Sequence, residues 1–210
     1  PRATAVAVID GNDNTQLDIL GGTGSILGIN FGDSSDNDQA RITCNTTSGA
    51  EDMSFTVNGT VYLNISAAGE IIKPLQPAFL AQPSSQQQNI QGDTNVTVVL
   101  GTERFDVGAN FASNTFTAPV TGKYFLSFVL YGVALPGTAN YLEIAITTSN
   151  RGYVNIQEPS GSEDVYAGGT VSCIADMDAN DTAFARITVG GSSSQFDIGT
   201  TTTFSGALIC

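Results

Sequence analysis

The chain has 210 residues and a formal net charge of −13, with 20 acidic side chains against 7 Lys and Arg and no histidine. So few cations exclude the phosphate neutralisation on which nucleic-acid binding depends, and they argue equally against docking on an anionic membrane. No apolar run approaches the ~20 residues that a membrane-spanning helix needs. The sequence therefore predicts a protein with neither nucleic-acid nor membrane partners.

The composition predicts an all-β fold. Glycine is abundant at 23 residues, Thr, Ser and Asn are frequent, and Lys, Glu and Arg, which favour helices, are scarce. The hydrophobic content of 41% suffices for a core. The cysteines Cys44, Cys173 and Cys210 are odd in number and widely spaced. With no C-x-x-C pair they fit neither a zinc site nor a disulfide framework, so we expect buried free thiols.

The first half of the chain ends at a joint over residues 73–89, where three prolines and a Gln/Ser run interrupt the strand pattern. "NG" at Asn58-Gly59, between two apolar runs, predicts a tight hairpin. The loops between these short strands are wholly polar, so the segment buries little surface by itself and other chains are expected to supply the missing contacts. The expected strands lie within four runs: 25–33, 39–44, 53–66 and 69–74.

The segment "INFGDSSDNDQARI", followed by "MSFTVNGTVYLNISAAGEI", resembles the shaft segments of bacteriophage tail-fibre and related virion proteins, over residues 24–73. The resemblance implies an intertwined, trimeric stalk. It divides the chain into an attachment arm over 1–23, a β-rich stalk over 24–76 and a C-terminal head over 77–210.

The second half carries strand-length runs in the number and spacing of a sandwich or jelly roll. They fall at 95–100, 115–118, 123–131, 141–148, 152–157, 170–177, 182–189 and 202–209, with short pieces at 78–81 and 105–107. The run 123–131 is apolar on both faces. One face would hold Tyr124, Leu126, Phe128 and Leu130, and the other Phe125, Val129 and Tyr131. The second face needs an extra layer or a subunit interface, and without helices the interface is favoured.

The motif "FTAPVTGKY" resembles the F-x-x-P-x-x-G-x-Y pattern of the C1q-like domain, a ten-stranded jelly roll of the C1q and tumour necrosis factor superfamily. Leu126 stands where that family has an aromatic residue, and the spacing before Phe116 is shorter than usual. The resemblance implies a homotrimer with Phe125, Val129 and Tyr131 at the interface. Pro119 and Gly122 are expected to form the turn before this strand, with Gly122 tolerating a positive φ. The other matching residues are Phe105, Asn110, Phe111, Tyr124, Phe128 and the final Phe204-Ser205-Gly206.

The absence of histidine excludes Ser-His-Asp and Cys-His catalysis, so no enzyme is predicted, although a paired-carboxylate glycosidase stays open as an alternative. No cofactor is predicted, with calcium as the alternative, since Asp-rich loops offer the oxygen ligands that calcium prefers. The weak calcium candidates are Asp33, Asp36 and Asp38 in one loop and Asp176 and Asp178 in another. Plain turn formation is the favoured explanation of these loops, because Asp and Asn are ordinary turn residues.

Three aromatic residues near Gly/Ser-rich turns are weak candidates for receptor contact: Tyr153, Tyr166 and Phe196. Together the two resemblances predict a structural phage protein at the virion surface, assembled in the host cytoplasm. Its trimeric head would bind a host glycan or protein, and its N-terminal arm would bind other virion proteins. The alternatives are a capsid decoration or head-fibre protein and, less favoured, a free C1q-like lectin or a carbohydrate hydrolase.

Overall fold

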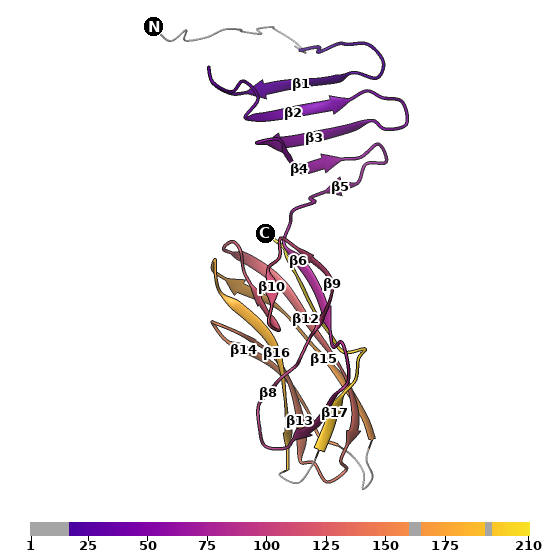
Figure 1. The fold of residues 1–210 in the computed structure, drawn as a ribbon, viewed down its shortest axis with the longest axis vertical. Coiled ribbons are helices and arrows are strands. Elements are labelled where there is room, and N and C mark those ends of the chain that lie inside the picture. The colour runs from indigo at the N-terminus through magenta and orange to yellow at the C-terminus, as the bar shows by residue number, and fades with distance from the viewer. Residues whose placement is uncertain (1–16, 160–164, 192–194) are drawn as a thin grey trace, which may run out of the picture. The chain divides into compact units, whose positions relative to one another are not determined.

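The computed structural model describes residues 17–159, 165–191 and 195–210 (Figure 1). Every regular element in these ranges is a β-strand, and they contain no helix long and apolar enough to cross a membrane. The chain forms two compact units, Pro1–Leu75 and Gln76–Cys210, which we call the N-terminal and C-terminal units. Their boundary falls within the joint expected over 73–89. Most of the arm predicted over 1–23 lies outside the described residues.

The N-terminal unit is a five-stranded antiparallel meander in which every strand pairs with its neighbour in sequence. Its strands are β1 (Ile26–Phe31), β2 (Ala40–Asn45), β3 (Asp52–Val57), β4 (Thr60–Ile65) and β5 (Ile71–Ile72). The hairpin expected at Asn58-Gly59 is confirmed, because it joins β3 to β4 with positive φ angles of 47° and 74° at these residues. Two successive positive φ angles match the turn type that "NG" favours.

The N-terminal unit has no core of its own. Thr56 is the one buried residue among the unit's described residues. Large apolar side chains such as Phe31, Val57 and Ile71 are exposed. A folded sheet normally buries at least one apolar face, so this unit is incomplete as a single chain.

The C-terminal unit is a sandwich of two antiparallel sheets. One sheet has six strands in the order β10-β11-β16-β13-β14, with β8 also paired to β16. These strands are β8 (Val96–Thr97), β10 (Phe111–Ala112), β11 (Thr115–Thr117), β13 (Tyr141–Thr148), β14 (Gly152–Gln157) and β16 (Thr182–Gly190). Non-sequential neighbours such as β11 and β16 give this unit a jelly-roll topology rather than a meander.

The other sheet has seven strands arranged around the long strand β12. β15 pairs along nearly the whole of β12 on one side, while β18 and β17 share its other side. β18 continues to β6 and β9, and β17 continues to β7. The strands are β6 (Ala78–Gln82), β7 (Gln87–Gln91), β9 (Thr102–Val107), β12 (Gly122–Leu135), β15 (Val165–Met177), β17 (Gln195–Ile198) and β18 (Thr203–Leu208).

An aromatic cluster lies at one part of the core between the two sheets. Phe79 stacks on Phe116 and Phe111, with ring centroids 4.7 and 5.0 Å away, and meets the edge of Phe204 at 5.0 Å. All four rings are buried. Such stacked and edge-on pairs add to the stability that burial alone provides.

The alternation expected along 123–131 is confirmed on β12. Tyr124, Leu126, Phe128 and Leu130 fill the core, whereas Phe125, Val129 and Tyr131 are 45%, 40% and 41% exposed. The all-β jelly-roll sandwich predicted for the second half of the chain is therefore the observed fold.

Three strands of this unit have no counterpart in the prediction. β7 is built from "QQNIQ", which reads as part of the polar joint, and β17 and β10 are four and two residues long. The expectation for Gly122 was also wrong, because its φ is not positive. Glycine is needed there because a Cβ would lie 2.6 Å from the backbone oxygen of Cys210.

Candidate functional site

The outer face of the seven-stranded sheet, which points away from the core, is a candidate interaction surface of the C-terminal unit. Cross-strand partners share one face of a sheet, so the register defines its rows. The first row is Ile174, Phe125, Ala207 and Ala78. The second is Ser172, Ser127, Ser205, Leu80 and Phe105. The third is Thr170, Val129 and Thr203. We refer to these three rows, with Tyr131 beyond them, as the outer face.

The outer face is apolar to mildly polar and carries no charged side chain in its three rows. Ile174 and Phe105 are 62% and 50% exposed, although side chains of this size and polarity are usually buried. The phenol ring of Tyr131 stacks on that of Tyr166, with centroids 6.0 Å apart and planes 11° from parallel. The sheet thus presents the central composition of a protein–protein interface, in which charge is depleted and aromatic residues are enriched.

The three receptor candidates lie in different environments. Tyr166 is 74% exposed near the start of β15, an edge strand of the seven-stranded sheet. Tyr153 is partly buried, packs against the core from β14, and has a pKa raised first by burial. Phe196 was a wrong candidate, because it points into the core from β17 and is fully buried. An isolated Phe between polar turns gave no sign that its strand pairs with β12.

The first acidic loop folds as a hydrogen-bonded turn. One Asp33 carboxylate oxygen accepts hydrogen bonds from the Ser35 hydroxyl at 2.6 Å and from the backbone N–H groups of Ser35 and Asp36 at 2.8 and 3.1 Å. Asp36 accepts from the backbone of Asp38, and Asp38 pairs with Arg41 at 3.3 Å. The structure therefore places these aspartates as turn-forming groups, each bonded to protein donors.

We predict that Asp33 titrates far below an ordinary aspartate. Its pKa is lowered to about 2, first by the hydroxyl of Ser35 and then by the backbone N–H groups of Ser35 and Asp36. Because the folded-state pKa is depressed, the stabilisation of this turn is complete above the ordinary value of 3.8 and is lost as the pH falls through about 2. A carboxyl ¹³C titration should show this midpoint, and Ser35→Ala should move it up toward 3.8. An unchanged midpoint in the variant would contradict the assigned cause.

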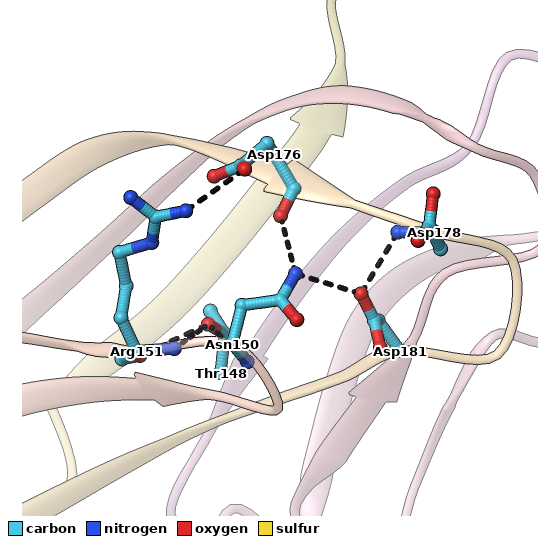
Figure 2. Close-up of polar contacts among 6 residues, drawn as sticks. All are labelled: Thr148, Asn150, Arg151, Asp176, Asp178 and Asp181. Carbon is cyan, nitrogen blue, oxygen red and sulfur yellow. Dashed lines mark hydrogen bonds and ion pairs between the residues drawn. The ribbon is translucent and has the colours of Figure 1, made fainter.

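The second acidic loop forms a polar cluster with residues of the β13–β14 turn (Figure 2). The Asn150 amide donates to the backbone oxygen of Asp176 and to the Asp181 carboxylate, both at 2.9 Å. The same Asp181 oxygen accepts the backbone N–H of Asp178 at 2.8 Å. Arg151 forms an ion pair with Asp176 at 2.9 Å, and both partners are about half exposed. The cluster therefore ties the β13–β14 turn to the loop between β15 and β16.

These contacts bear on the calcium alternative. In the part of the chain that the structure describes, no group of three or more Cys, Asp or Glu side chains is placed to hold a metal ion. Asp176 and Asp178 border a shallow hollow of about 430 Å³, but Asp176 is paired with Arg151 and the two do not converge with a third carboxylate. The geometry gives calcium no support, and the absence of a cofactor stays a prediction.

We predict that Asp181→Ala lowers the stability of the C-terminal unit by about 1–2 kcal/mol. The variant removes the acceptor for Asn150 and Asp178, and hydrogen bonds to charged groups contribute about this much in partly exposed sites. Urea unfolding at fixed protein concentration measures the change. Asp197→Ala is unsuitable as a control because Asp197 binds Gln86 and Asn89. Glu103→Ala, on an exposed side chain of β9, should leave the free energy of unfolding within about 0.5 kcal/mol.

The cysteines are all free, as expected, but they are less buried than predicted. Cys44 and Cys173 are partly buried and Cys210 is exposed. Burial raises the pKa of the Cys173 thiol to about 11, which keeps it protonated and unreactive near neutral pH. Sequence reasoning also missed Asn150 and Asp181, which lie 31 residues apart and are brought together because β13 pairs with β16 in one sheet. Ile174, by contrast, was foreseeable from the alternation within 170–177.

Comparisons with known proteins extend this description. No family model and no curated protein matches the chain. Among solved structures, the globular domain of zebrafish complement 1qA is 17% identical over 64% of this chain and 98% of its own, with a TM-score of 0.45. The structure of Eiger TNF from S. frugiperda is 10% identical over 65% of this chain and 92% of its own, with a TM-score of 0.47. The strand pairing described above gives the C-terminal unit an all-β jelly-roll fold.

Proposed function

We propose that this chain is a non-enzymatic structural protein of a bacteriophage virion: a homotrimeric fibre or spike whose head, residues 77–210, binds a host surface glycan or protein. One observation carries the proposal. β12 completes the core with one face and leaves Phe125, Val129 and Tyr131 exposed on the other, although nothing in the fold requires large apolar side chains there.

The argument for self-association is energetic. Each exposed side chain of this size gains roughly 1.5–3 kcal/mol from full burial, and the outer face offers several of them together. A stable monomer rarely leaves such a contiguous patch in water. Because the N-terminal unit also lacks a cover for its apolar residues, the same partner explains both units most simply, and that partner is the chain itself. The C1q-like pattern supports three copies rather than two.

The viral assignment is supported by the shaft-like motifs of residues 24–73, and residues 1–23 supply the attachment arm in this proposal. In the head, Tyr166 is the best-placed of the receptor candidates because 74% of its surface is exposed. Its ring has one face against Tyr131 and lies beside a hollow of about 370 Å³ that also contains Gln157 and Glu158. Aromatic rings next to hydrogen-bonding groups suit sugars and peptide chains alike.

The receptor role is tested with the purified full-length protein, fluorescently labelled, on an array of bacterial envelope polysaccharides and on intact cells. We expect saturable binding to at least one envelope preparation, weakened by Tyr166→Ala at unchanged native mass. Binding to none of them would overturn the receptor role. Gold-labelled antibody on particles then locates the protein, and density over the shell instead of the tail would identify a capsid decoration protein.

A further inference from the structure

We infer that in the trimer proposed above each copy folds residues 26–72 into its own complete sheet, and that three such sheets pack through one apolar face without exchanging strands. This inference rests on the proposed trimer and specifies how its stalk is built. The partner of this face is therefore the same face of two further copies of the chain.

The register sorts the side chains of the N-terminal unit onto two different faces. One row joins Leu27, Cys44, Met53, Ile65 and Ile71, and a second joins Ile29, Ile42, Phe55 and Leu63. A third row adds Phe31, Ala40 and Val57, with Thr60 at its end. We call these residues the apolar face. It contains no charged group, and it includes a hollow of about 230 Å³ that Ile19 helps to line.

The opposite face is largely polar and already satisfied within the chain. The hydroxyl groups of Thr43 and Ser54 lie 3.2 Å apart across β2 and β3, and the Asn64 amide donates to Asp52. Arg41 also lies on this side and pairs with Asp38. The sheet therefore has one face suited to water and one that must be covered, which specifies packing from a single side.

The absence of a core in the N-terminal unit indicates which partner covers its apolar face. Because the unit buries so little of its own surface, its apolar face must be covered whenever the unit is folded, so the cover has to be permanently present. The apolar face has no charged group, so its partner must also be uncharged and apolar. A second copy of the chain offers such a face and is always present. Four six-residue strands and the two-residue β5, at about 3.4 Å per residue and about 4.8 Å between strands, give a face of about 400–450 Å². Since a stable interface takes about 800 Å² per partner, the face needs the head to hold the copies together.

The pairing within one chain argues against exchanged strands, although the shaft resemblance implied an intertwined stalk. All five strands pair in sequence order, and β3 is joined to β4 by only Asn58 and Gly59. A two-residue turn cannot carry a strand into a neighbouring subunit. Backbone bonds also close the other loops locally, as from Ala50 to Thr47 at 2.9 Å and from Asp33 to Asp36 at 2.7 Å.

A disulfide experiment tests whether the sheet is complete within one chain. Thr43→Cys and Ser54→Cys are combined in the full-length protein carrying Cys44→Ser and Cys210→Ser, because adjacent cross-strand hydroxyls at 3.2 Å place the new thiols within bonding range. After oxidation we expect a single-chain band on a non-reducing denaturing gel, with the mass loss of one disulfide, and a trimer by native light scattering. Cross-linked dimers or trimers, absent from either single-cysteine control, would overturn the inference while leaving the trimer intact.

A charge placed on either face tests which one is covered. Ile42→Asp on the apolar face should make residues 17–75 sensitive to limited proteolysis while the C-terminal unit stays intact, whereas Thr43→Asp on the opposite face should leave the unit as resistant as the unmodified protein. Equal resistance in both variants would overturn the face assignment. A monomeric unmodified protein would instead refute the proposed trimer itself, so the two failures are distinguishable.

Discussion

Val129→Asp is expected to convert the protein from a trimer to a monomer without unfolding the C-terminal unit. Val129 points outward from β12 and is 40% exposed in a single chain, so a carboxylate there is well solvated in the monomer. In the assembled outer face it would be a buried charge without a partner, repeated in each copy, which costs several kcal/mol per site. Light scattering measures the mass, and circular dichroism checks that the β-sandwich persists.

Val154→Asp is the matched control for this variant. Val154 is 52% exposed on β14 of the six-stranded sheet, where the proposal places no interface. This second variant should keep the native mass of the unmodified protein. If Val129→Asp also kept that mass, the outer face would not be the subunit interface, and the account of Phe125, Val129 and Tyr131 would be wrong.

Phe79→Ala is expected to destabilise the C-terminal unit by about 3–5 kcal/mol, the range for removing a large aromatic ring from a packed core. Phe79 is 1% exposed and contacts three other aromatic rings, so the cavity would lie at the centre of the cluster. Urea unfolding measures the loss at one fixed protein concentration, because assembly makes stability depend on concentration.

Val120→Ala provides the comparison for the core variant. Val120 is 47% exposed in the turn before β12, so its truncation should change the free energy of unfolding by less than about 0.5 kcal/mol. A similarly small effect for Phe79→Ala would show that the aromatic cluster is not the core that the strand arrangement indicates.

The alternation along β12 and the hairpin at Asn58-Gly59 were predictable because both depend on local periodicity and turn chemistry. β7 and β17 were not, since "QQNIQ" and "QFDI" are ordered by pairing with each other and by the pairing of β17 with β12, which are distant in sequence. The burial of Phe196 follows from that pairing. Long-range contacts of this kind leave no periodic signal in a short polar segment.

The candidate sites also divide into features that local periodicity predicts and features that depend on residues distant in sequence. The outward direction of Phe125, Val129 and Tyr131 followed from a period of two, and the apolar face of the N-terminal unit could have been found by applying the same period to its strands. The acidic loops looked like ligand sets because sequence reveals the residue types but not their partners. In the structure, Asp33 bonds to Ser35, and Asp176 to Arg151. Only the folded structure shows that these carboxylates already have hydrogen-bond or ion-pair partners within the chain.

The native mass of the unmodified full-length protein, measured by light scattering, tests the central claim most directly. The chain has a mass of 21.7 kDa, and the account predicts three times this value across a range of protein concentrations. A stable monomer at 21.7 kDa would contradict it. In that case the apolar residues on the outer face and on the sheet of the N-terminal unit would need a cover other than copies of the chain.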